Sequence, residues 1–282
     1  MPDVITNKQE FHIKISISGK TTLDWLSETS GFSRQKIKAA MQKGCVWLER
    51  DQKQTFIQRL RRAKKTLNQG DTLHVYYDES VLSAKPKPAA LVADMGAYSI
   101  WNKPSGMLSQ GSKWGDHCTV YRWAEMHLQP ERASFVVHRL DRAASGLIIL
   151  AHNKSVATQF SRMFEQRELE KRYRVVIEGD FTCALPTVGK RLTITAKIDD
   201  KHAVSHVDLI AYNADENIST LEVQIETGRK HQIRKHLSDI GFPVVGDRLY
   251  GSGNSLEDLK LTAVSLKFIC PVTGEEKRFT LK

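Results

Sequence analysis

Cysteine is scarce in this sequence, and its few cysteines lie far apart. They form no CxxC pair and no cysteine–histidine set with the spacing of a zinc site; they are Cys45, Cys118, Cys183 and Cys270. These absences argue against a disulfide framework and a structural zinc, so we expect reduced thiols in a cytosol. At 282 residues the chain does not need such crosslinks, because it is long enough to bury a substantial core in one large domain and a small one.

Export and membrane signals are also missing. The stretch MPDVITNKQEFHIKI lacks the charged start and the apolar core of a signal peptide, and no apolar run approaches the length that spans a membrane. We therefore expect a soluble, cytoplasmic protein without a membrane partner.

The motifs of several common enzyme classes are absent. The sequence contains no GxSxG nucleophile motif, no GxxxxGK[ST] phosphate loop and no HExxH zinc motif. The stretch GSGNS at 251–255 lacks the strand and helix that flank a nucleotide-binding loop. The sequence thus gives no support to these hydrolase and nucleotide-binding classes.

Basic residues, by contrast, are abundant and concentrated. The chain has 42 Lys and Arg against 32 Asp and Glu, a formal net charge of +10. Residues 33–65 contain eleven of the basic residues and only two acidic ones, so nearly the whole excess lies there. Many charge runs are only solvated surface, but an excess confined to one segment is typical of a polyanion-binding protein. The candidate polyanion-binding residues are Arg34, Lys38, Arg61, Arg62, Lys64 and Lys65.

The N-terminal part has the pattern of a small α/β module. Two short helices are predicted at 21–31 and 33–44, and Ser33 is the expected N-cap of the second. Strand patterns surround them at 10–17, 45–49 and 72–77. A helix opened by Ser-Arg and a closing Gly-Asp-x-Leu before the last strand resemble the S-four-type RNA-binding module. The stretch WLERDQKQT at 47–55 departs from the Val-Asn-Gly turn that is usual in that module.

Composition divides the chain into two domains. The stretch SAKPKPAALVAD at 83–94 is the predicted linker between the module, 1–82, and a larger domain, 95–282. Strand patterns dominate the larger domain, and helices are predicted only at 153–169 and 230–241, the second with Ile233, Leu237 and Ile240 facing inward. This balance indicates an α+β domain with a mixed, largely antiparallel central sheet.

One carboxylate in the larger domain has an unusual setting. The stretch FVVHRLDRAASGLIILA at 135–151 places Asp141 between Arg139 and Arg142, in a polar segment that separates two apolar runs. A buried strand cannot continue through these charges, so the segment must loop out at a sheet edge or into a cleft. An acid between arginines usually belongs to a salt-bridged surface loop, and the residues alone leave that alternative open.

Four segments, in order along the chain, resemble the RluA family of RNA pseudouridine synthases. They are NKPSGMLSQG at 102–111, VVHRLDRAASGLIILA at 136–151, FEQRELEKRYRVVIEG at 164–179 and ETGRKHQIRKHLSDIGFPVVGDRLYG at 226–251. The resemblance implies an isomerase that cuts the glycosidic bond of a uridine in RNA, turns the uracil and rejoins it through carbon five. It implies that Asp141 acts on the nucleotide, either by adding to the base or by assisting its departure from the sugar.

The resemblance also implies roles for other residues. Arg234 matches the arginine that pairs with the catalytic acid, and Tyr173 matches the tyrosine that packs against the target base and is a candidate to handle the carbon-five proton. Arg139 matches the side chain that fills the gap left when the base swings out. Weaker candidates for substrate binding are Arg229, Lys171 and Lys103. Surface charge at a helix terminus is an equal alternative for Arg229, and the simpler interpretations are a solvated side chain for Lys171 and a turn that shapes the pocket wall for Lys103.

The implied partner is RNA. Family members that carry the N-terminal module mostly modify large-subunit ribosomal RNA, so we expect that target, with transfer RNA as a second possibility. We expect a monomer, and neither a metal nor an organic cofactor, because the reaction is a redox-neutral rearrangement. The alternative is a ribosome assembly factor or other RNA-binding protein that keeps the synthase fold without turnover.

The catalytic motif departs from its family at one position. Ala144 stands where the family usually has threonine, so a hydroxyl is missing three residues after the acid. If that hydroxyl holds the loop in the family, Ser145 or backbone groups must replace it here.

Overall fold

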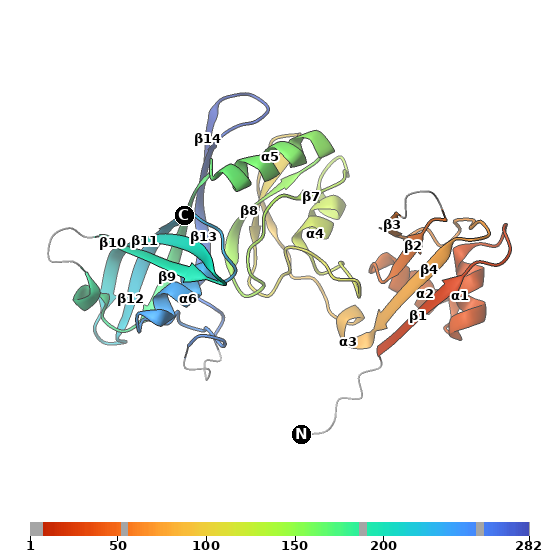
Figure 1. Ribbon diagram of the computed structural model, residues 1–282, viewed down its shortest axis with the longest axis horizontal. Coiled ribbons are helices and arrows are strands. Elements are labelled where there is room, and N and C mark those ends of the chain that lie inside the picture. Colours follow the sequence, from red (N-terminus) through yellow and green to blue (C-terminus); the bar gives the residue numbers. More distant parts are fainter. Residues whose placement is uncertain (1–7, 52–55, 186–190, 252–256, 282) are drawn as a thin grey trace, which may run out of the picture. The chain divides into compact units, whose positions relative to one another are not determined.

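The computed structural model describes residues 8–51, 56–185, 191–251 and 257–281 (Figure 1). The chain divides into two compact units, one made of residues 1–86 with 110–123 and the other of residues 87–109 with 124–282. The boundaries expected from composition differ from this division mainly in residues 110–123, which composition places in the larger domain.

Among the described residues, the first unit is a four-stranded antiparallel sheet packed with helices. The strand order is β1-β4-β2-β3. Its elements are β1 (Lys8–Lys14), α1 (Thr22–Ser30), α2 (Arg34–Gln42), β2 (Val46–Glu49), β3 (Ile57–Arg59), β4 (Thr72–Asp78) and α3 (Glu79–Leu82). Leu48 and Leu73 of the sheet share a core with Ile37 of α2. Ser33 caps α2 as predicted, because its hydroxyl accepts a hydrogen bond from the N–H of Lys36. The stretch 47–55, which differs from the Val-Asn-Gly turn that is usual in the module, lies partly outside the described residues.

Residues 110–123 join this unit through a buried carboxylate. Asp116 is 1% exposed, accepts hydrogen bonds from Arg61 and Tyr121, and lies 3.3 Å from Nε of Arg59. Its backbone N–H also donates to the carbonyl of Lys43. The pair between Arg61 and Asp116 joins positions 55 residues apart, so no local sequence pattern reveals it.

The second unit has an α+β fold, as predicted. Among the described residues its ten-stranded sheet has the order β10-β11-β12-β9-β13-β8-β6-β5, with β14 beside β13 and β7 beside β8. Of the strand pairs in this described sheet, only β8–β13 is parallel. The strands are β5 (Ala90–Asp94), β6 (Tyr98–Lys103), β7 (Phe135–Val136), β8 (Ser145–Ala151), β9 (Glu170–Glu178), β10 (Arg191–Ile198), β11 (Lys201–Asn213), β12 (Ile218–Ile225), β13 (Leu261–Ile269) and β14 (Glu276–Thr280). The other elements of this unit are α5 (Lys154–Gln166), the 3₁₀ turn η1 (Phe181–Ala184) and α6 (Gln232–Asp239), and α4 (Val120–His127) begins in the first unit and ends in the second.

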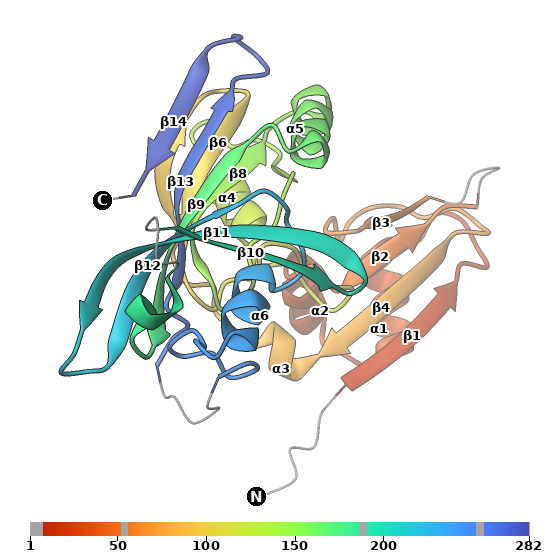
Figure 2. The ribbon, with the colours of Figure 1, turned by 60° about the vertical axis from the view of Figure 1, so that its left-hand side comes forward.

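The two predicted helices cover different parts of this sheet (Figure 2). Phe160 of α5 packs with Tyr98 and its neighbours, and Ile233 and Leu237 of α6 belong to a second core. The prediction that Ile240 faces inward is wrong. α6 ends at Asp239, and the Ile240 side chain beyond it is 37% exposed.

The predicted linker contains a strand. Ala90–Asp94 forms β5, which pairs with β6 in antiparallel register. Residues 90–94 at the end of the stretch therefore form the edge of the sheet. The proline-rich residues before them connect to this strand.

The parallel pair of strands brings the sequence motifs together (Figure 2). Ser145 and Gly146 at the start of β8 lie opposite Thr262 and Ala263 of β13, and Ala263 also lies opposite Tyr173 of β9. Gly146 has a φ of +108°, and a Cβ atom there would be 2.3 Å from the Ala263 carbonyl oxygen, so only glycine fits. The loop that precedes β8 and the middle of β9 consequently meet at one place in the sheet.

Candidate active site

The loop between β7 and β8 carries the acid. Its apolar residues Leu140 and Ala144 are buried, whereas Arg139 and Arg142 are exposed. The Asp141 side chain is 28% exposed, which leaves its carboxylate accessible while the backbone on either side of it is anchored. The alternation follows from the sequence, because the loop can bury only its apolar side chains.

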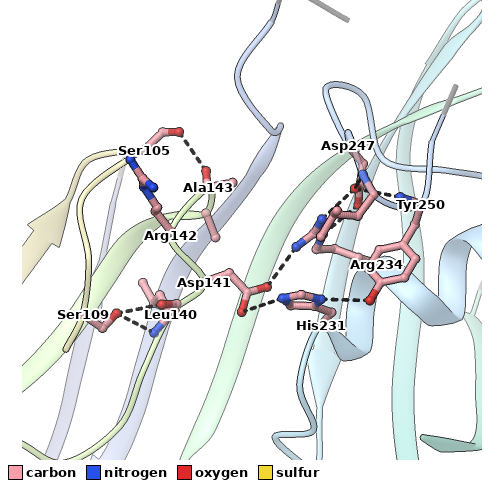
Figure 3. A network of polar contacts seen from close by, with 12 residues as sticks. Ser105, Ser109, Leu140, Asp141, Arg142, Ala143, His231, Arg234, Asp247 and Tyr250 are labelled. Carbon is pink, nitrogen blue, oxygen red and sulfur yellow. Dashed lines mark hydrogen bonds and ion pairs between the residues drawn. The ribbon is translucent and has the colours of Figure 1, made fainter. Parts of the chain in front are cut away.

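The segment 103–109, which holds most of the NKPSG motif, fastens this loop. Ser109 donates to the carbonyl of Leu140 and accepts from its N–H, at 2.7 and 3.0 Å, and Ser105 donates to the carbonyl of Ala143 at 2.8 Å (Figure 3). The N–H of Gly106 donates to the carbonyl of Arg142 at 2.8 Å. These bonds hold nearly every backbone position around Asp141 without a threonine hydroxyl at position 144.

Lys103, a candidate for substrate binding, is buried beneath the loop. Its side chain is fully buried, and its ammonium group donates to the carbonyls of Ala144 at 2.6 Å and Met107 at 2.9 Å. Burial lowers the pKa of Lys103 to about 8, although the nearby charge of Asp141 opposes the shift. Lys103 therefore fastens the loop from inside the protein and does not line the pocket beside the acid.

Arg234 lies beside Asp141, as the motif implied. It is 4% exposed on α6, and its Nη1 atom is 3.5 Å from Oδ2 of Asp141 (Figure 3). The other two nitrogens of its guanidinium donate hydrogen bonds to Asp247, with Nε–Oδ2 at 2.7 Å and Nη2–Oδ1 at 2.6 Å. A bidentate pair of this kind fixes the plane of the guanidinium, and so fixes the direction in which Nη1 points.

Asp247 has no role that the sequence alone predicts. Burial by itself raises the pKa of this carboxyl, but hydrogen bonds from Arg234 and from the N–H groups of Leu249 and Tyr250 outweigh burial and lower it. Its only sequence signal is its position in the matched segment 226–251, in the letters VVGDRLYG. Another polar residue of that segment, His231, lies 3.8 Å from Oδ1 of Asp141, and Tyr250 contacts His231 (Figure 3).

A pocket of about 100 Å³ opens beside the loop. Asp141, Tyr173 and Arg234 line it, and so do two of the four predicted substrate-binding residues, Arg139 and Arg229. Burial, and then the charge of Asp141, raise the pKa of Tyr173 well above its usual value, so its phenol keeps its proton. The structure thus brings together all three predicted catalytic residues.

Lys171, like Lys103, lies outside that lining. Its ammonium group is 5.7 Å from the ring centroid of Phe164, and burial lowers its pKa. His138 of the His-Arg-Leu-Asp motif stacks on the same ring, at a centroid distance of 4.4 Å, and its Nε2 atom accepts a hydrogen bond from the N–H of Ile149. These two residues therefore support the packing around the loop.

The basic segment forms a hollow in the first unit. Of the predicted polyanion-binding residues, all but Arg34 line it, together with Gln42 and Ala63. Arg34 instead pairs with Asp24 at 2.9 Å, and the charge of Arg61 is partly neutralised by Asp116. The cations that remain without an acidic partner in this hollow, as far as the described residues show, are Lys38, Arg62, Lys64 and Lys65.

Metal-binding clusters and membrane-spanning helices are absent from the described ranges. No group of three or more His, Cys, Asp or Glu side chains in the described residues is arranged to hold a metal ion. No helix in that part of the chain is long and apolar enough to cross a membrane.

The fold is that of pseudouridine synthases. The structure resembles human RNA pseudouridylate synthase domain-containing protein 1, with a TM-score of 0.56 at 20% identity over 71% of this chain and 86% of that one. It resembles human RNA pseudouridylate synthase domain-containing protein 4 with a TM-score of 0.53 at 22% identity, over 68% and 88% of the two chains.

The sequence comparisons identify the family. Residues 97–239 match the RNA pseudouridylate synthase family, which covers half of the chain. The chain is 32% identical to the uncharacterised RNA pseudouridine synthase YhcT of Bacillus subtilis over 62% of each chain. It is 30% identical to tRNA pseudouridine synthase C of Vibrio vulnificus over 62% of this chain and 82% of that one. It is 29% identical to ribosomal large subunit pseudouridine synthase D of Vibrio cholerae over 72% and 69% of the two chains. The chain therefore belongs to the RNA pseudouridylate synthase family of isomerases.

Proposed function

We propose that this chain isomerises specific uridines of large-subunit ribosomal RNA to pseudouridine, with Asp141 as the reactive group. The observation that carries the proposal is the position of Asp141 at a pocket, with Oδ2 against Nη1 of Arg234 and with Tyr173 in the pocket wall. The surface-loop alternative for this acid does not account for a buried arginine that is itself held by a second buried acid.

The chemistry requires a carboxylate that can reach a nucleotide. The glycosidic bond to nitrogen one breaks, the uracil turns, and a bond from the sugar to carbon five forms as the carbon-five proton leaves. Asp141 can add to the base or assist its departure, and both routes are compatible with its partly exposed position. The sugar and both sides of the base must be reachable, so the uridine has to leave its stack. Arg139, exposed at the pocket, is the proposed occupant of the vacated place.

Tyr173 is proposed to pack against the target base. Its raised pKa favours the neutral phenol, which supports packing and hydrogen bonding more than proton abstraction by a phenolate. Arg229 lines the same pocket, and its Nε atom donates to the carbonyl of His202 at 3.2 Å, which leaves its terminal nitrogens available for a phosphate.

The first unit is proposed to bind the RNA backbone through its basic hollow, as an S-four-type module would. Cations gathered in one concavity without acidic partners among the described residues favour contact with a phosphate chain. The ribosomal target is supported by the resemblance to this module and by the relative named as a large-subunit enzyme; the relative named as a transfer-RNA enzyme supports the second possibility.

The target is tested by mapping pseudouridine in ribosomal and transfer RNA from cells with and without the protein, and from cells that carry Asp141→Asn. We expect one or a few large-subunit positions to lose pseudouridine in both deficient strains. Loss at transfer-RNA positions alone would overturn the ribosomal assignment. Unchanged maps in both strains would support the assembly-factor alternative.

A further inference from the structure

His231 makes a second polar contact to Asp141, to the carboxylate oxygen that Arg234 does not face, and Tyr250 contacts His231 in turn (Figure 3). The Nδ1 atom of His231 is 2.9 Å from the hydroxyl of Tyr250, and Nε2 is 3.8 Å from Oδ1 of Asp141. The His231 side chain is only 16% exposed, and the two rings are arranged edge to face at 5.6 Å. His231 has a φ of +56°, a left-handed conformation that histidine adopts more often than most residues other than glycine, asparagine and aspartate.

The positions of the protons follow from the acceptor at one end. A carboxylate oxygen can only accept, so of the two neutral tautomers of His231 the one with its hydrogen on Nε2 turns a donor toward Oδ1, although this 3.8 Å contact is longer than a hydrogen bond. Nδ1 then has a lone pair, and the Tyr250 hydroxyl donates to it. Tyr250 thereby selects the one neutral tautomer of His231 that can approach Asp141 favourably.

We propose that His231 and Tyr250 are a positioning pair that orients Oδ1 of Asp141 for reaction, an inference that rests on the proposed function. The carboxylate then has its two oxygens divided between two donors. Oδ2 stays with the cation Arg234, whose own position is fixed by Asp247. Oδ1 has the longer contact with a neutral donor, so it is the oxygen that is released to the nucleotide.

The charges around His231 agree with a neutral ring. Asp141 faces it from the loop, Lys230 and Arg234 from its own segment, and Asp247 and Tyr250 from the turn after α6. Burial lowers the pKa of His231, Asp141 and Asp247 oppose this shift, and Arg234 and Lys230 reinforce it, with a net lowering. A ring that is neutral at pH 7 can hold Oδ1 without forming a second ion pair that would compete with the substrate.

The test compares two amide substitutions at position 231. In His231→Gln the amide nitrogen reaches about as far as Nε2, so it can still donate to Oδ1. In His231→Asn the amide ends near the place of Nδ1 and cannot, although asparagine tolerates the positive φ at least as well as histidine does. The substrate is RNA labelled with tritium at carbon five of uridine. We expect His231→Asn to lower kcat by about 10- to 100-fold, with KM little changed. We expect His231→Gln to retain activity within about fivefold of wild type.

Tyr250→Phe supplies the second arm of the test. It removes the hydroxyl but keeps the ring, which also lies 5.1 Å from the guanidinium carbon of Arg234. We expect Tyr250→Phe to lower kcat in the wild-type background and to have little further effect when combined with His231→Asn, because both changes break one chain of contacts. If the losses of kcat in the two single variants add up in the double variant, His231 and Tyr250 do not act together, and the inference is wrong.

His206→Gln is the matched control, since His206, on β11, pairs with Glu226 and does not line the pocket. Equal activity of His231→Asn and wild type would overturn the inference while leaving the proposed function intact. A loss in His231→Asn that His231→Gln shares would also overturn it, because donation at Nε2 would then not be what matters. Absence of turnover by wild type would instead overturn the proposed function itself.

Discussion

Asp247 holds Arg234 through two short hydrogen bonds, Nε–Oδ2 at 2.7 Å and Nη2–Oδ1 at 2.6 Å, and this leaves Nη1 for Asp141. The two acids thus share one guanidinium, but only Asp247 is fully buried. The buried acid sets the direction of the arginine, and the partly exposed acid has two long contacts, to Nη1 of Arg234 at 3.5 Å and to Nε2 of His231 at 3.8 Å, and an open side. This asymmetry explains how one arginine can be both rigid and available at the pocket.

Asp247→Asn tests this arrangement. It removes a charge from a buried pair, so we expect the free energy of unfolding to fall by about 3 kcal/mol and kcat to fall about tenfold or more. Denaturant unfolding and turnover kinetics measure the two effects. Asp208→Asn is the control, because Asp208 forms a similar pair with Arg191 at a more exposed site and should cost less than about 1 kcal/mol. Equal effects of the two substitutions would contradict the role of Asp247.

Lys103→Met tests the buried fastening of the loop. Loss of the ammonium leaves the carbonyls of Ala144 and Met107 without this donor, and an unpaired buried carbonyl costs about 1–3 kcal/mol. We expect lower stability and lower kcat, with little change in the affinity for RNA. A loss of RNA binding at full stability would instead support the substrate-binding role predicted from the sequence.

The pH dependence of stability provides a second test of Lys103. Its pKa is about 8 in the folded protein and has an ordinary value of 10.5, so between these values the unfolded chain binds a proton that the folded chain does not. The free energy of unfolding of wild type should therefore rise with pH in this window relative to Lys103→Met, by up to about 3 kcal/mol. Urea titrations of both proteins at several pH values measure the difference. A difference that stays flat or falls would contradict the burial of a charged ammonium.

Ser109→Ala tests the bonds next to the acid. The hydroxyl of Ser109 both donates to and accepts from the backbone of Leu140, so its removal leaves two buried groups unpaired beside Asp141. We expect kcat to fall about tenfold, with KM unchanged. Ser105→Ala, which removes a single bond to the carbonyl of Ala143, should have a smaller effect. The account is contradicted if Ser105→Ala has the larger effect.

The basic hollow is tested by salt. Replacing Arg62, Lys64 and Lys65 with glutamine should flatten the dependence of RNA affinity on salt concentration, by about 0.7 in the log–log slope for each phosphate that the variant no longer neutralises. Lys20→Gln is the control, since Lys20 pairs with Glu28 and lies outside the hollow. An unchanged slope in the triple variant would show that the hollow does not contact RNA.

Sequence motifs predicted that three residues far apart in the chain would lie together. Asp141, Tyr173 and Arg234 come from three distant segments, and the structure places all three at one pocket. The α+β class also followed from the strand patterns. The pairing of distant segments, by contrast, has no local signal, which is why composition does not place residues 110–123 and their anchor Asp116 with the first unit.

Residues that support the loop and the arginine were harder to predict than those proposed to act on the nucleotide. Lys103 and Asp247 are charged, and charged residues are usually on the surface, so their full burial could not be inferred from composition. The missing threonine at Ala144 has an explanation only in the structure. The Ala144 side chain packs in a core, its carbonyl is held by Lys103, and Ser145 forms a separate bond to Thr262 at 2.9 Å.

The most direct measurement of the central claim is tritium release from RNA labelled at carbon five of uridine. Turnover must expel that hydrogen, because carbon five becomes the point of attachment to the sugar. We predict that wild type releases tritium from large-subunit ribosomal RNA and that Asp141→Asn, folded to the same extent, releases none above background. Release by Asp141→Asn at the wild-type rate would contradict the assignment of Asp141 as the reactive group.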